Sequence, residues 1–142
     1  GFTGSAGFTY REAIEDGRLA IQEARRIGAQ TVLVAPGARG GHTFRHAQRV
    51  VGDGLRFLAE IAARHGVTLA VLTAPQRAWQ SRWSSIDTLE LAQQLLEVVD
   101  SPWVGLAIPA SRWADHASAR ATLRTLAPRI RVVTSEPLRQ LD

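Results

Sequence analysis

An arginine and a histidine lie in a glycine-rich stretch, PGARGGH, that directly follows an apolar run. The guanidinium of Arg39 suits phosphate or carboxylate groups, and the imidazole of His42 can bond to a sugar hydroxyl or a phosphate. Gly37, Gly40 and Gly41 can present backbone N–H groups to an anion, or they can form a tight turn. Their spacing matches neither the P-loop nor the dinucleotide fingerprint. We therefore favour the turn and keep Arg39 and His42 as candidate ligand-binding residues.

Three more candidate ligand-binding residues lie in or near predicted loops. Arg112 comes shortly after an apolar run, and Trp83 lies in a polar, aromatic loop where its ring can stack on a sugar or fill the core. Glu136 is the acidic residue that follows a predicted strand most closely. The other carboxylates fall mainly on predicted helices or at their ends. The sequence therefore predicts no carboxylate pair for general acid–base catalysis at the strand ends.

Helices and buried strands alternate along the chain and must position these residues. Apolar residues at helical spacing predict helices over 10–27, 44–64, 115–127 and a stretch that ends near residue 99. Apolar runs without alternation predict strands over 31–35, 67–72, 103–108 and 130–133. This order, a helix followed by three strand–helix units and a last strand, predicts parallel strands joined by right-handed crossovers.

Capping residues mark the ends of the predicted helices. Thr9 and Glu12 fit a capping box, and Thr43 precedes the second helix as its N-cap. Asp87 is interpreted as the cap of the third helix, with Glu90 three residues later. Gly28 follows the first helix at the position where a glycine usually ends a helix.

Four parallel strands do not close an eight-stranded barrel, so two fold classes stay open. One is a small open α/β sheet. The other is α/β with parallel β/α repeats that form a partial (β/α)8 TIM-barrel-like domain. The leading helix with no strand before it favours the second. We expect residues 1–142 to form a single domain that is incomplete at both ends.

Long stretches of the sequence resemble one family of barrel proteins. They are GFTYREAIEDGRLAIQEARRIGAQTVLVAPGARGGHT, HGVTLAVLTAP, WSSIDTLELAQQLLEVVDSPWVGLAI and RIRVVTS. They resemble the xylose isomerase-like TIM-barrel family of sugar phosphate isomerases and epimerases, which also has an endonuclease branch. The resemblance covers essentially the whole chain and implies barrel strands four to seven. It also implies a divalent metal such as Mn or Mg at the carboxyl mouth of the barrel, where the metal polarises sugar oxygens.

The sequence departs from this family at the positions of the usual metal ligands. Leu72 stands in place of the glutamate that ends strand five, and Pro109 in place of the aspartate that ends strand six. Thr134 stands in place of a histidine near strand seven, and Arg112 in place of another histidine near strand six. A leucine or proline side chain does not coordinate a hard cation. We therefore expect no metal site and no evident cofactor in this chain.

Three functions follow from the resemblance and this departure. The first is a degenerate, pseudoenzyme-like member that only binds a small sugar-like or anionic ligand. The second is an active isomerase or epimerase that uses ligands outside this chain or another constellation, such as His42, Arg112 and Glu136. The third is a structural half-barrel whose exposed sheet edges pair with a second copy, which gives a homo-oligomer.

The amino-acid composition argues against several kinds of site and partner. Cysteine is absent, which excludes disulfides and thiolate metal sites, and no apolar run is long enough to span a membrane. The net charge is +4, and all 17 basic residues are arginine. These arginines are scattered along the sequence, so we expect no nucleic-acid partner. We expect a cytoplasmic protein.

Overall fold

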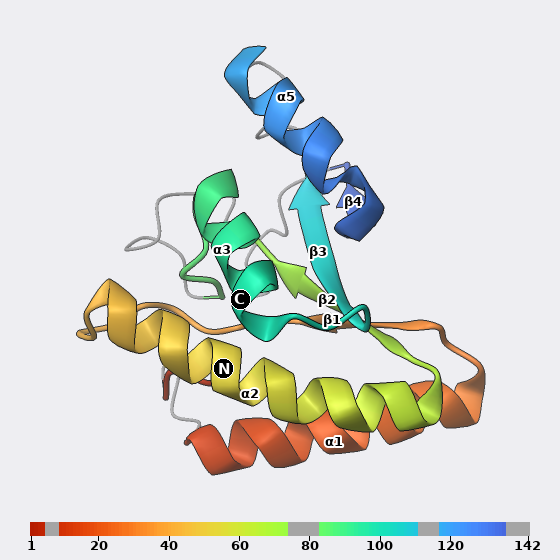
Figure 1. The fold of residues 1–142 in the computed structure, drawn as a ribbon. Helices are drawn as coiled ribbons and strands as arrows, with labels where there is room; N and C mark the ends of the chain where they lie inside the picture. The colour runs from red at the N-terminus through yellow and green to blue at the C-terminus, as the bar shows by residue number, and fades with distance from the viewer. Residues whose placement is uncertain (5–8, 74–82, 111–116, 136–142) are drawn as a thin grey trace.

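The computed structural model of the chain describes residues 1–4, 9–73, 83–110 and 117–135 (Figure 1). In these residues four strands form one parallel sheet in the order β1-β2-β3-β4. The strands are β1 (Thr31–Val34), β2 (Thr68–Leu72), β3 (Val104–Pro109) and β4 (Ile130–Thr134). The helices are α1 (Tyr10–Ile27), α2 (Phe44–His65), α3 (Leu89–Val99) and α5 (Ala117–Leu126), with a 3-10 turn η2 (Ala127–Arg129) before the last strand. The predicted order of elements is confirmed.

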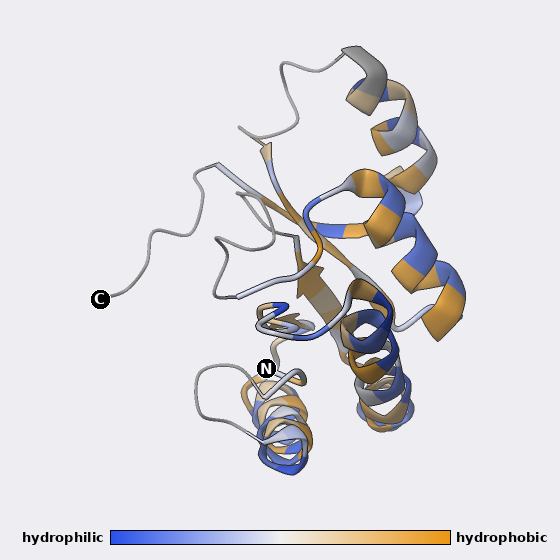
Figure 2. Ribbon diagram, turned by 90° about the vertical axis from the view of Figure 1, so that its left-hand side faces the viewer, coloured by the Kyte–Doolittle hydropathy of each residue, from blue (hydrophilic) through white to orange (hydrophobic). Residues whose placement is uncertain are grey.

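The helices α2, α3 and α5 lie on one side of the sheet (Figure 2). Helix α1 packs against α2 and β1, α2 against α3 and β2, and α3 against α5 and β3. The hydrophobic core fills the space between helices and sheet, and Leu55, Leu58, Leu69 and Leu106 are among its fully buried side chains. Both layers contribute to the core, because the helices are amphipathic and the inner strands are apolar except for Thr68 at the start of β2.

Capping residues begin and end the helices largely where the sequence predicts. Thr9 and Glu12 form the capping box of α1, and the Thr43 hydroxyl accepts a hydrogen bond from the His46 amide. Gly28 adopts the left-handed conformation, with a φ of 79°, that ends α1. Glycine reaches this conformation without the steric cost that a Cβ brings.

One cap and one strand boundary differ from the sequence prediction. Thr88, not Asp87, is the N-cap of α3, and its hydroxyl accepts from the Leu91 amide. The strand predicted over 103–108 runs from Val104 to Pro109, so the proline is its last residue. Phe44, in the first turn of α2, is 37% exposed.

Candidate functional site

The carboxyl ends of the parallel strands meet at one edge of the sheet, and the strand register aligns side chains there. Leu72 is paired with Ala107, and Pro109 is paired with Thr134. Paired residues share a face, and Ala107 and Pro109 are two apart on one strand, so all four project from the same face. Their neighbours in sequence, such as Ile108, belong to the core beneath the helices. The four residues therefore lie on the face turned away from the helices, which is the inner face in a closed barrel.

Thr73 fixes the path of the chain as it leaves β2. Its amide and its hydroxyl both donate to the carbonyl of Ala107, at 3.1 Å and 3.2 Å. The residue is only 3% exposed. No local pattern in the sequence indicates this role of Thr73, because its partner lies 34 residues away.

The glycine-rich loop after β1 is bound to the segment that carries Trp83. The Gly37 amide donates to the Trp83 carbonyl at 2.8 Å, and Gly37 forms an isolated parallel bridge with Ser84. Gly37 has a φ of 102°, a conformation that favours glycine. Since this N–H is already used within the protein, Gly37 does not present it to an anion. The structure supports the interpretation of Gly37 as a turn residue.

The first residues of the chain form hydrogen bonds with the same loop. The Phe2 amide donates to the Pro36 carbonyl at 3.0 Å, and the Thr3 hydroxyl donates to the Ala38 carbonyl at 2.7 Å. The Phe2 side chain is 3% exposed and lies against Gly54 of α2. Residues 1–4 therefore hold the loop between the end of β1 and the start of α2.

His42 lies on the side of the loop that faces these first residues. Its Nε2 atom is 3.1 Å from the Thr3 carbonyl oxygen, and its ring centroid is 4.7 Å from that of His46. A depression of about 450 Å³ opens beside it. This depression is lined by Phe2, Thr3, Gly4, Tyr10, His42, His46, Val50 and Asp53.

Of the remaining candidate residues, Arg39 and Trp83 lie within the described part of the chain, and Arg112 and Glu136 do not. The Arg39 guanidinium lies 4.6 Å above the centre of the Phe44 ring, and Trp83 is 47% exposed. The hydrogen bond from Gly37 to Trp83 thus brings the Trp83 segment beside the loop that carries Arg39 and His42. Arg112 and Glu136 lie outside the described residues, so the constellation that includes them stays a prediction.

Carboxylates with a shifted pKa lie on α1. Hydrogen bonds from the Thr9 amide and hydroxyl lower the pKa of Glu12, and hydrogen bonds from Arg18 and Arg26 lower those of Glu15 and Glu23. These interactions are on the helix surface and indicate no catalytic group. Within residues 1–4, 9–73, 83–110 and 117–135, no group of three or more histidine, cysteine, aspartate or glutamate residues is placed to hold a metal ion. In the same ranges no helix is long and apolar enough to cross a membrane.

Four parallel strands in sequence order, with helices packed on one side, are the architecture of part of a (β/α)8 barrel. The comparison with protein families agrees. The family model of the xylose isomerase-like TIM barrel matches residues 1–133, and the chain belongs to this family.

Solved structures share this fold. A crystal structure of a Sinorhizobium meliloti 1021 protein is similar, with 25% identity and a TM-score of 0.75 over 92% of this chain and 48% of the other. A structure of L-ribulose 3-epimerase has 20% identity and a TM-score of 0.75 over 94% and 46%. A crystal structure of the IolI protein with a bound zinc atom has 19% identity and a TM-score of 0.70 over 85% and 42%. The chain thus spans about half the length of these structures. No curated protein matches its sequence.

Proposed function

We propose that the carboxyl edge of this sheet forms part of a sugar-binding mouth. The residues at the positions where the family usually binds a metal do not coordinate one in this chain. One observation carries the proposal: the strand register aligns Leu72, Pro109 and Thr134 on one face at one edge. By the family resemblance these are ligand positions. A leucine methyl and a proline ring have no lone pair for a cation, and a neutral threonine hydroxyl is a weak donor compared with a carboxylate or imidazole.

The ligand of this mouth is a small sugar-like or anionic molecule. Two features favour that class: the family to which the chain belongs, and the L-ribulose 3-epimerase among its structural neighbours. The half-exposed Trp83 ring offers an apolar surface to the C–H face of a sugar. Arg39, on the loop bound to the Trp83 segment, offers a cation to a phosphate or carboxylate.

Restoring carboxylates at the two strand ends tests the assignment of the ligand positions. The double variant Leu72→Glu/Pro109→Asp is expected to gain weak binding of Mn²⁺, because two carboxylates then project from neighbouring strands on one face. The matched control Leu19→Glu/Val98→Asp adds the same charges at exposed helix positions and should gain none. Calorimetric titration measures both. Equal Mn²⁺ binding by the two variants, or none by either, contradicts the assignment.

A second candidate function, self-association of the half-barrel, rests on the two edge strands. Leu33 on β1 is 43% exposed and Val133 on β4 is 63% exposed. Both strands have an unpaired edge among the described residues. An unpaired edge with apolar side chains favours pairing with another strand. Sedimentation velocity should then detect a dimer at high micromolar concentration, and a monodisperse monomer at that concentration overturns this candidate.

A further inference from the structure

A groove between α2 and α3, on the outer surface of the helical layer, has a volume of about 580 Å³. It is lined by Arg45, Gln48, Arg49, Asp53, Arg56, Gln94, Leu95, Glu97 and Val98. The three arginines are spread over 12 residues in the sequence, and the helical repeat gathers them on one face. The groove lies outside the carboxyl edge of the sheet and is independent of the sugar-binding proposal.

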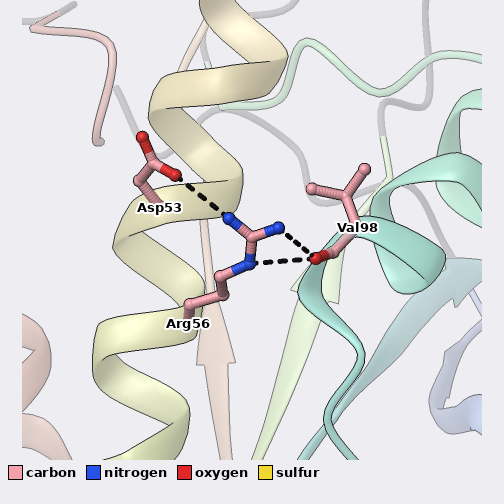
Figure 3. A network of polar contacts seen from close by, with 3 residues as sticks. All are labelled: Asp53, Arg56 and Val98. Atoms are coloured by element: carbon pink, nitrogen blue, oxygen red, sulfur yellow. Dashed lines mark hydrogen bonds and ion pairs between the residues drawn. The ribbon is translucent and has the colours of Figure 1, made fainter.

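Two of the arginines in this groove have no partner among the described residues, while its other charged side chains have partners. The Arg56 guanidinium donates to the Val98 carbonyl through Nε at 2.9 Å and Nη2 at 2.6 Å, and to Asp53 through Nη1 at 3.3 Å (Figure 3). Glu97 accepts a hydrogen bond from the Gln93 amide. Among the described residues, Arg45 and Arg49 form neither an ion pair nor a side-chain hydrogen bond.

The position of Arg45 on α2 is electrostatically unfavourable without a counter-ion. Arg45 lies in the first turn, where the helix dipole is positive and a cation destabilises the helix, and Arg49 follows one turn later. Helix α1 has Glu12 in its first turn and α3 has Glu90, but α2 has no acidic residue there. An anion bound between Arg45 and Arg49 removes this unfavourable interaction and satisfies both guanidinium groups.

We propose that the α2–α3 groove is a binding site for a phosphate-bearing anion. Arg45 and Arg49 are one helical turn apart, so both guanidinium groups can reach one phosphate and donate paired hydrogen bonds to its oxygens. Gln48 and Gln94 supply further amide donors, and Leu95 and Val98 form an apolar wall for the rest of the ligand. The source of the phosphate is a small phosphate ester or a phosphodiester backbone.

Calorimetric titration of the full chain with inorganic pyrophosphate at low ionic strength tests the site. The double variant Arg45→Gln/Arg49→Gln should bind pyrophosphate about tenfold more weakly or worse than the unaltered chain. The matched control Arg11→Gln/Arg25→Gln removes two exposed arginines of α1 that pair with no carboxylate of the described residues, and its affinity should stay within about threefold of the unaltered chain. An equal loss in both variants overturns the proposal, because overall charge then explains binding. No binding to the unaltered chain also overturns it.

Two further measurements complete the test. Without ligand, Arg45→Gln/Arg49→Gln should melt at the same temperature as the unaltered chain or higher, since it removes the cation of Arg45 from the first turn of α2. A lower melting temperature contradicts the argument from the helix dipole. A single-stranded oligonucleotide that binds more tightly than pyrophosphate, with the same loss in the double variant, assigns the phosphate to a phosphodiester backbone. Tighter binding of pyrophosphate assigns it to a small ester.

Discussion

A methyl group added at Gly54 has opposite effects on stability depending on Phe2. Gly54 lies inside α2, and a Cβ atom there comes within 2.6 Å of Phe2 Cδ1 and 2.8 Å of Phe2 Cε1. Replacing a helical glycine by alanine normally stabilises a protein by about 1 kcal/mol. Overpacking of a well-filled core costs about 1–3 kcal/mol. Gly54→Ala in the unaltered chain should therefore be neutral or lower the free energy of unfolding by up to about 2 kcal/mol.

The sign reverses once the phenylalanine ring is removed. Phe2→Ala alone should cost about 3 kcal/mol, because the ring is only 3% exposed. In that background Gly54→Ala meets no ring and should stabilise by about 1 kcal/mol. Urea unfolding of the four proteins gives the coupling, with an expected value of about 1–3 kcal/mol. Stabilisation by Gly54→Ala in both backgrounds would refute the packing of residues 1–4 against α2.

Three further predictions concern the sheet, the α2–α3 contact and the first helix. Gly105→Ala should lower the free energy of unfolding by about 1–3 kcal/mol, because its Cβ would collide with the Arg129 carbonyl oxygen. Gly41→Ala, whose methyl meets open space, should change it by less than about 0.5 kcal/mol in the same urea titration, and equal effects would contradict this packing. Arg56→Met should cost about 1 kcal/mol, since it removes two hydrogen bonds to the Val98 carbonyl, and Arg56→Lys should recover little because an ammonium lacks the planar fork. Full recovery in thermal melts of Arg56→Lys would show that charge alone matters. Glu12 has a lowered pKa in the folded state, so its stabilisation is present above its ordinary pKa of about 4.3 and is lost as the pH falls through the folded value. The difference in melting temperature between the unaltered chain and Glu12→Gln should shrink from pH 7 to pH 3, and a constant difference would contradict this linkage.

Local patterns in the sequence predicted most of the fold. The stripe of α1 and its Thr9–Glu12 capping box placed that helix at residues 10–27, where the structure has it. The strand near residue 104 was predicted because its apolar run lacks alternation, and all of β3 is buried. The family resemblance is confirmed by the match over residues 1–133, and the barrel-like α/β fold by the parallel sheet and by the solved structures that share it. These features depend on neighbours in sequence, which is why they can be predicted from it.

Contacts between distant segments could not be predicted in the same way. The Thr3 hydroxyl reaches the Ala38 carbonyl across 35 residues, and the Arg56 guanidinium reaches the Val98 carbonyl across 42. Neither partner carries a local signal, because a backbone carbonyl is present at every residue. The candidate site depends on such long-range contacts more than the helices and strands do. The glycine-rich loop marks Arg39 and His42 as candidates, but Arg39 contacts Phe44, and His42 contacts Thr3 and His46. The contact with Thr3 depends on how the chain folds back.

The metal content of the unaltered chain tests the central claim most directly. Elemental analysis of the purified protein, followed by calorimetric titration with Mn²⁺, Mg²⁺, Co²⁺ and Zn²⁺, measures whether the mouth holds a cation. The positions of Leu72, Pro109 and Thr134 predict no stoichiometric binding of any of the four. One equivalent of any of these metals bound by the unaltered chain would contradict the proposal that the mouth holds no cation.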